Sequence, residues 1–89
     1  MELRDLRCFI SVYDAKGFGR AAAALNTTQS NVSARIRKLE QEFEGPLFLR
    51  LHRGIAPTAK GALAYRYASE VIARTDRVAE AIRNNDAAA

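Results

Sequence analysis

The sequence predicts a mainly α-helical fold with a small two-stranded β-hairpin and a long C-terminal helix. Residues 20–40 (RAAAALNTTQSNVSARIRKLE) contain a short Ala-rich helix, a polar break, and a second helix that begins after a capping residue. Glycine and proline at positions 45, 46 and 54 bracket a short extended segment. Apolar residues then recur at helical spacing as far as about residue 83, which predicts a single long helix.

The first element is predicted to be an amphipathic helix. Its apolar residues recur at helical spacing, at Leu3, Leu6, Phe9, Ile10 and Tyr13. Its solvent face is expected to carry Arg4, Asp5 and Arg7. Gly17 is expected to end this helix, and Phe18 to anchor the following turn in the core. Gly19 is expected to cap a second helix that runs to about Leu25.

A third helix is predicted from about Gln29 to Phe43, opened by a Thr28 cap. Its apolar residues form one buried stripe at steps of four, three and four: Val32, Ile36, Leu39 and Phe43. The small side chains of residues 21–24 allow the second helix to cross the third closely. Two helices joined by a short polar turn are typical of a helix-turn-helix, whose second helix presents its first exposed side chains to the major groove of DNA.

Amides and hydroxyls at the start of this third helix are candidates for DNA contacts. The Gln29 amide can both donate to and accept from the Hoogsteen edge of adenine; the alternative is an ordinary exposed residue after a cap. Asn31 is a candidate for phosphate alone. Ser33 offers a hydroxyl to a base or a phosphate, with a hydrogen bond back to its own helix as the alternative.

A two-stranded wing is predicted after the third helix. Residues 47–49 read as a buried strand, residues 50–54 as a basic turn that ends in Gly54, and Ile55 as the start of a return strand. Pro57 suits an edge strand or its exit, and Thr58 a helix cap. The long side chains of Arg50 and Arg53 can reach phosphate or a narrow minor groove, and plain solubility is the alternative.

The long helix, from about Ala59 to Arg83, is predicted to form a homodimer. Its heptad seam consists of Ala64, Ala68, Val71, Thr75, Val78 and Ile82, widened by Ile72 and Ala79. Such a seam extends beyond a small core, so a second copy of the helix is its simplest cover. The alternative is that the seam packs on its own domain, which can hold near Leu63 and Tyr67 but is not expected after Arg74. Residues 85–89 have no apolar period and are expected to be a frayed end.

The distribution of charge agrees with a phosphate-binding face. The net charge is +4, and nine of the 14 cations lie in two blocks without acids, at residues 15–39 and 45–69. On the third helix these cations are Arg35, Arg37 and Lys38, which are therefore candidates for DNA phosphate. A solvated surface that is basic by accident is the alternative reading.

The sequence offers little to build an enzyme, a metal site or a membrane anchor. Cys8 is the only cysteine and His52 the only histidine, so no internal disulfide or zinc site can form, and no cofactor is expected. Cys8 is expected to fill the core. No Gly-rich phosphate loop or carboxylate pair suggests catalysis. Without an apolar run of about twenty residues, a soluble cytoplasmic chain is expected.

The chain resembles the N-terminal DNA-binding domain of LysR-type transcriptional regulators. The resemblance covers roughly Met1 to Ala73 and rests on four blocks in order: LRDLRCFISV, GFGRAAAALNTTQSNVS, IRKLEQEFEGPLFLR and RGIAPTAKG. It implies a winged helix-turn-helix in residues 1–58 and a linker helix in residues 59–84 that pairs two subunits. It also implies a larger ligand-sensing domain that is absent from this sequence, so any small-molecule effector would act through that domain.

Position by position, the resemblance places Gln29, Ser30 and Ser33 in the major groove. Thr28 would lie near phosphate, and the wing arginines near the backbone or minor groove. Many relatives have Pro where Ser30 stands and Arg where Ala34 stands, which leaves open whether Arg35 supplies the missing contact. Gly19 replaces a commoner Thr or Ser cap, and Pro57 a commoner apolar residue.

The function predicted from the sequence is therefore sequence-specific binding of double-stranded DNA by a homodimer that recognises an operator with two half-sites. The alternative from another class is a basic, dimerising protein-interaction module that does not read DNA. Salt-dependent, sequence-specific binding to a duplex distinguishes the two.

Overall fold

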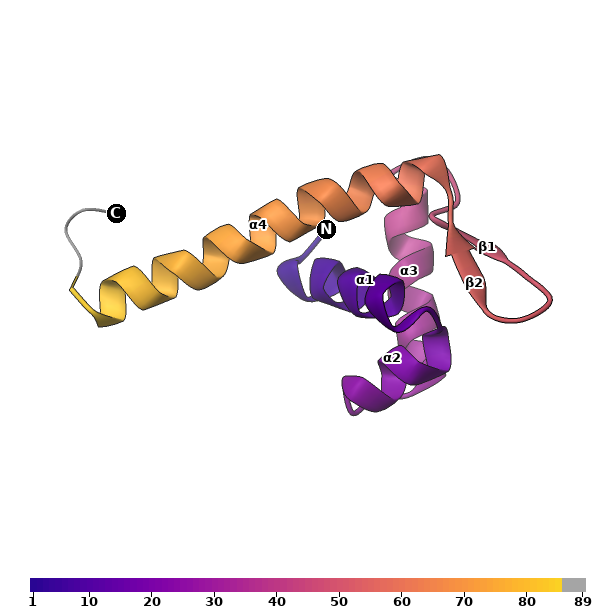
Figure 1. The fold of residues 1–89 in the computed structure, drawn as a ribbon, viewed down its shortest axis with the longest axis horizontal. Coiled ribbons are helices and arrows are strands. Elements are labelled where there is room, and N and C mark those ends of the chain that lie inside the picture. Colours follow the sequence, from indigo (N-terminus) through magenta and orange to yellow (C-terminus); the bar gives the residue numbers. More distant parts are fainter. Residues whose placement is uncertain (86–89) are drawn as a thin grey trace.

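The structure is a computed structural model that describes residues 1–85. A small helical body carries a β-hairpin on one side and a long helix that projects beyond it, so that the molecule measures 50 × 26 × 19 Å (Figure 1). In chain order the elements are α1 (Leu3–Ala15), α2 (Phe18–Ala24), α3 (Gln29–Glu42), β1 (Phe48–Arg50), β2 (Ile55–Pro57) and α4 (Ala59–Arg83).

The core forms where α1, α2 and α3 meet. Its largest fully buried apolar side chains are Phe9, Val12, Val32, Leu39 and Leu47. Ala21 is completely buried and Ala22 nearly so, where α2 packs against α1 and α3. Ala23 and Ala24 are exposed, so the predicted close crossing uses only the first two of the four small side chains. Phe18 and Cys8 are also buried, as predicted. Leu3, by contrast, is 44% exposed and contributes little to the core.

At the junction of α1 and α2, the first helix ends one residue earlier than predicted and the cap of the second lies two residues earlier. Lys16, not Gly17, ends α1: it adopts the left-handed conformation (φ 59°) and its N–H donates to the carbonyl of Val12. Gly17 is then extended and serves as the N-cap of α2, so Gly19 lies inside that helix instead of capping it. The prediction failed because it assigned the left-handed position to the nearest glycine.

A tight turn separates α2 from α3. Asn26 adopts a positive φ of 56°, which Asn tolerates better than most residues, and the N–H of Thr27 donates to the carbonyl of Ala22 over 2.9 Å. Thr28 then caps α3, because its Oγ1 accepts from the N–H of Asn31 at 3.1 Å. The predicted helix-turn-helix is confirmed by this arrangement.

The wing is an antiparallel pair in which Phe48, Leu49 and Arg50 face Pro57, Ala56 and Ile55. The first strand begins one residue later than predicted, because Leu47 is tied to α3 and α4: its N–H donates to Glu40 Oε2 at 2.8 Å and its carbonyl accepts from the N–H of Thr58 at 3.0 Å. Gly54 takes the positive φ (81°) that closes the turn.

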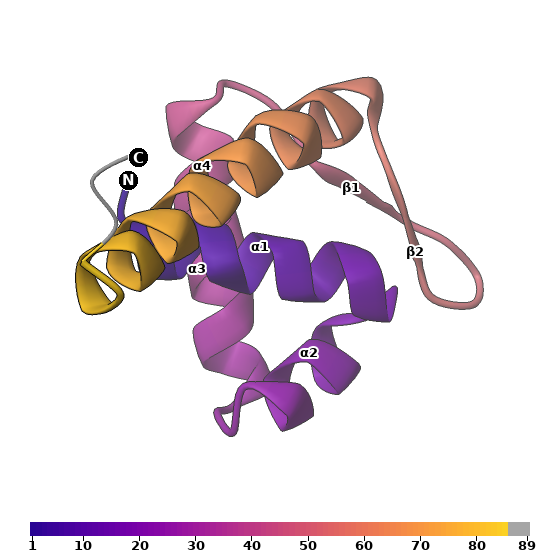
Figure 2. The same cartoon turned by 60° about the vertical axis from the view of Figure 1, so that its left-hand side comes forward.

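The first half of α4 packs against α1, and the second half projects from the body (Figures 1 and 2). Thr58 caps it by accepting from the N–H of Gly61 at 2.9 Å. Farther along, Arg7 of α1 pairs with Asp76 at 3.0 Å. Within residues 1–85, no helix combines the length and apolar character needed to cross a bilayer.

Candidate nucleic-acid interface

The start of α3 presents an exposed polar surface. Gln29, Ser30 and Asn31 are exposed, while Ser33 is half-buried. The Asn31 side chain donates to Thr27 Oγ1 at 3.0 Å. This bond fixes the turn before the Thr28 cap relative to the first turn of α3. The structure thus brings the predicted base-contacting residues together at one end of one helix, where a duplex could reach them.

Gln29 lies close to α2. A Cβ atom placed on Gly19 would lie 3.4 Å from Gln29 Oε1, at the short end of van der Waals contact. The glycine therefore leaves the Gln29 amide room beside α2, although this position is not the cap predicted from the sequence.

Asp5 is the centre of a network that the sequence analysis missed. Its side chain is 1% exposed, whereas it was predicted on the solvent face of α1, and that prediction is wrong. Asp5 Oδ1 accepts from Arg35 Nη1 at 3.1 Å, and Oδ2 accepts from Lys38 Nζ at 3.2 Å and from the N–H of Glu2 at 3.1 Å. Two cations that were candidates for DNA phosphate therefore also tie α3 to α1.

The same network determines the charge state of these groups. Burial raises the pKa of the Asp5 carboxyl, but the hydrogen bonds from Glu2, Lys38 and Arg35 together outweigh it, so the pKa lies below its ordinary value of 3.8. The hydrogen bond to Asp5 in turn raises the pKa of Lys38. Asp5 is therefore a carboxylate at neutral pH, paired with two cations.

The remaining predicted phosphate contacts differ in how they are held. Arg37 is exposed, and no ion pair involves it within residues 1–85. Arg50 stacks its guanidinium over the Phe18 ring, 4.8 Å from the centroid, which fixes the base of the wing. Arg53 lies in the exposed turn. Lys60, which belongs to the second basic block, instead caps the end of α3: its Nζ donates to the carbonyls of Phe43 and Glu44.

The predicted dimer seam divides into a buried part and an exposed part. Ala68 is 3% exposed and Ile72 packs against the core, so both belong to the chain's own body, and the dimer contact predicted for Ala68 is corrected accordingly. Thr75 is half-buried and Ala79 exposed. Val71, Val78 and Ile82 are 42%, 53% and 73% exposed.

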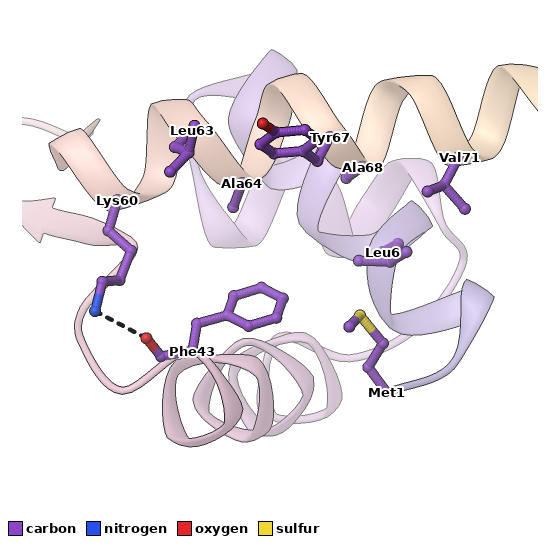
Figure 3. Close-up of a pocket in the computed structure, with 9 residues that line it drawn as sticks. All are labelled: Met1, Leu6, Phe43, Lys60, Leu63, Ala64, Tyr67, Ala68 and Val71. Carbon is purple, nitrogen blue, oxygen red and sulfur yellow. Dashed lines mark hydrogen bonds between the residues drawn. The ribbon is translucent and has the colours of Figure 1, made fainter.

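An apolar groove borders the exposed part of the seam (Figure 3). Leu63, Tyr67 and Val71 line it from α4, while Leu6 and Phe43 line it from α1 and the end of α3, and its volume is about 330 Å³. Leu63 and Tyr67 are themselves more than half exposed and face the groove (Figure 3). Ala64 and Ala68 beside them pack on the core, so in this part of α4 the seam does pack on its own domain, the alternative given for this region.

Signals for the missed residues were present in the sequence. Cys8, Phe9 and Val12 follow Asp5 by three, four and seven residues, so Asp5 lies on the same buried face of α1 as these three residues. Glu40 and Lys60 had no comparable signal, because each acts on a backbone group that only the folded chain brings near.

Four helices, a tight turn before α3 with its exposed polar start, and a two-stranded hairpin define a winged helix-turn-helix domain. Residues 3–62 match the model of the bacterial regulatory helix-turn-helix proteins of the lysR family, and the chain belongs to this family.

Relatives and solved structures agree with this family. The chain is 41% identical over 86 residues to the HTH-type transcriptional regulator CzcR of Bacillus cereus, covering 97% of this chain but 30% of CzcR. It is 42% identical over 83 residues to BudR of Klebsiella aerogenes, covering 93% of this chain and 58% of BudR. The chain thus spans about a third of the length of the CzcR relative.

Among solved structures, the DNA-binding domain of BenM in complex with catB site 1 DNA superposes with a TM-score of 0.91 at 31% identity, over 98% of both chains. The LysR family regulator CbnR superposes with a TM-score of 0.87 at 31% identity, over 93% of this chain and 29% of CbnR. The resemblance therefore extends through α4 as well as the winged domain.

Proposed function

We propose that this chain binds double-stranded DNA sequence-specifically as the DNA-binding domain of a lysR-family transcription regulator. The observation that carries the proposal is the exposed polar start of α3, held by the Thr28 cap, in a fold that superposes on a domain solved on DNA. A major groove about 12 Å wide admits a single helix, so α3 can enter it along its exposed face.

In this proposal Gln29, Ser30 and Ser33 read base edges and the cations around them contact phosphate. Thr28, Asn31 and Arg37 lie on or beside the exposed start and outer face of α3. Arg35 and Lys38 each have N–H groups left over after bonding to Asp5, so they can serve both partners. Arg50 and Arg53 give the wing its contact with the backbone or the minor groove.

We further propose that α4 pairs two copies of the chain. Its second half projects from the body with Val71, Val78 and Ile82 exposed, and an apolar groove lies beside it (Figures 1 and 3). Burying these side chains against a second α4 would remove apolar surface that a lone chain leaves in water. Residues 1–58 would then form the DNA-reading unit and residues 59–84 the linker that sets the distance between two half-sites.

In this proposal the chain acts by binding DNA in the cytoplasm, and that activity requires no catalytic group of its own. Residues 86–89, which make up most of the expected frayed end, lie outside the described residues.

Selection of bound duplexes from a random library, followed by titration at several salt concentrations, tests the proposal. The expected result is enrichment of one motif as two related half-sites separated by about one helical turn (~34 Å) or a multiple of it. Binding to the enriched duplex should exceed binding to scrambled duplexes by about 10³-fold or more. Equal, weak binding to all duplexes would instead favour the basic protein-interaction module.

A further inference from the structure

A second cavity, of about 240 Å³, lies between α1, the turn before α3, and α3 itself. Three arginines line it, Arg4 and Arg7 from α1 and Arg35 from α3, and no acidic side chain is among the lining residues. A cavity lined by several cations concentrates a positive electrostatic potential, which favours the binding of an anion. None of the DNA contacts proposed above uses Arg4 or Arg7.

The three guanidinium groups keep donors for a further partner. Arg4 Nε pairs with Glu2, Arg7 Nη2 with Asp76 and Arg35 Nη1 with Asp5, each at 3.0 to 3.1 Å. A guanidinium has five N–H donors, so each arginine retains several. The Arg4 and Arg7 pairs are exposed to solvent, where such pairs stabilise little and are readily exchanged for a stronger anion.

The rest of the lining suits a tetrahedral oxyanion at the mouth of an apolar pocket. Leu25, Val32 and the buried Cys8 give the cavity apolar walls, and such walls strengthen charge interactions beside them. Thr27 adds a hydroxyl whose oxygen already accepts from Asn31 Nδ2, so its own hydrogen is free to donate.

The position of the cavity selects the source of the anion. Thr27 directly precedes the cap of α3, so the cavity adjoins the end of the helix that is proposed to enter the major groove. The start of α1 and the wing lie on opposite sides of α3 (Figures 1 and 2). A helix in the major groove has one phosphate strand on each side. The wing can reach one of them, and the cavity faces the other.

We propose that Arg4, Arg7 and Arg35 form a binding site for a phosphate of the DNA backbone, on the strand opposite to the one that the wing contacts. The inference rests on the proposed DNA binding and adds a second phosphate-binding surface to it. Arg35 then has two partners at once: Asp5 holds its position, and the phosphate takes its remaining donors.

Two variants of one ion pair separate this role from a structural one. Arg7→Ala and Asp76→Asn both remove the ion pair between Arg7 of α1 and Asp76 of α4, but only the first removes a cation from the cavity. On the duplex selected above, Arg7→Ala should lower the magnitude of the salt slope, the change in log affinity with log salt concentration, by about one. Asp76→Asn should leave this slope unchanged, and its affinity for the duplex should be unchanged or slightly higher. Arg66→Ala, an equal charge loss on the exposed face of α4, should leave the slope unchanged.

Single methylphosphonate substitutions along the selected duplex then locate the contact. One position should weaken binding of the original chain but not of the Arg4→Ala, Arg7→Ala double variant, because that variant has already lost the contact. The proposal is overturned if the double variant matches Arg66→Ala in affinity for the duplex and in salt slope. This holds even if inorganic phosphate shifts the arginine Nε–H resonances in an NMR titration, because the cavity would then bind only a free anion and not the DNA backbone. Absence of any duplex binding by the original chain would count against the proposed function itself.

Discussion

Asp5 Oδ1 lies 3.1 Å from Arg35 Nη1 and joins two helices across 30 residues of sequence. Asp5 is almost completely buried, whereas the Arg35 side chain is 34% exposed, so the pair spans the boundary between the core and the surface of α3. Lys38 reaches the other carboxylate oxygen from the next turn of α3. The helix proposed to read DNA is therefore fixed to α1 by charge as well as by its apolar stripe.

Asp5→Asn should destabilise the fold. The amide keeps the shape of the side chain but loses the charge, and its NH₂ group cannot accept from the cation beside it. Because both cations are partly exposed and can be rehydrated, the expected loss of unfolding free energy is about 1–3 kcal/mol, below that of breaking a fully buried pair. Urea denaturation measures it, with Asp76→Asn, an exposed pair, as the control that should lose less than about 1 kcal/mol.

The same pair should make the stability depend on pH in acid. The folded-state pKa of Asp5 lies below 3.8, so its contribution is fully present above the unfolded value and is lost as pH falls through the folded value. The difference in unfolding free energy between the original chain and Asp5→Asn should stay constant from neutral pH to about pH 5 and shrink below 3.8. A difference that remains constant down to about pH 2 would contradict the role given to the carboxylate.

Local sequence patterns predicted the elements better than the contacts between them. The bounds of α4, Ala59–Arg83, were predictable because the Thr58 cap and the apolar repeat are local signals. The burial of Asp5 was not, because counting charged residues as solvent-facing overrode its place in the stripe of Phe9 and Val12. The share of the seam that faces its own core depends on where α4 crosses α1, which only the fold determines.

In the candidate interface, too, local features could be predicted from the sequence and contacts between elements could not. The start of α3 could be predicted residue by residue, because a cap fixes which side chains come first and which of them are exposed. The cavity beside it joins Arg4 of α1 to Thr27 of the turn and Arg35 of α3, three positions that no periodicity links. The ion pairs of Arg35 and Lys38 with Asp5 could not be predicted from the acid-free stretch around them, because Asp5 belongs to another helix.

Gly61→Ala should destabilise the fold through a steric clash. Gly61 is buried near the start of α4, and a Cβ atom there would overlap the carbonyl oxygen of Leu47. That carbonyl accepts from the N–H of Thr58, so it cannot move away without cost. The expected loss is about 1–3 kcal/mol or more. Gly17→Ala is the control: Gly17 is extended and its Cβ would meet nothing closer than 3.9 Å, so a comparable loss there would remove the steric explanation.

Gln29→Ala should reduce specificity more than general affinity. The side chain is exposed at the first position of α3 and can contact a base edge only on a duplex of the right sequence. Binding to the selected duplex should weaken by roughly 1–3 kcal/mol, with preference relaxed at one base pair in each half-site. Anisotropy titrations on selected and scrambled duplexes measure both effects.

Arg53→Ala is the matched comparison for Gln29→Ala. A cation in the wing turn contacts phosphate, so its loss should weaken binding to all duplexes by a similar factor and lower the salt slope by about one. If Gln29→Ala behaves in the same way as Arg53→Ala, Gln29 contacts the backbone and does not read a base.

Placing Asp at both Val78 and Ile82 should abolish pairing of α4. Both side chains lie on the projecting half of α4, 53% and 73% exposed, and nearer the tip than any residue of the core, so the winged domain should keep its fold. In a paired helix the two carboxylates would be buried without partners, which opposes association. Sedimentation at micromolar concentration should find a monomer, and far-ultraviolet circular dichroism an unchanged helix content.

The same double variant should bind a duplex with two half-sites far more weakly, while a single half-site is bound about as before. The second domain of a dimer binds at a high effective concentration, and that advantage disappears in a monomer. Arg66→Ala, on the exposed face of the same helix, should stay dimeric. If the double variant stays folded and dimeric, the exposed seam is not the interface, and the groove lined by Leu63 and Tyr67 must be covered in another way.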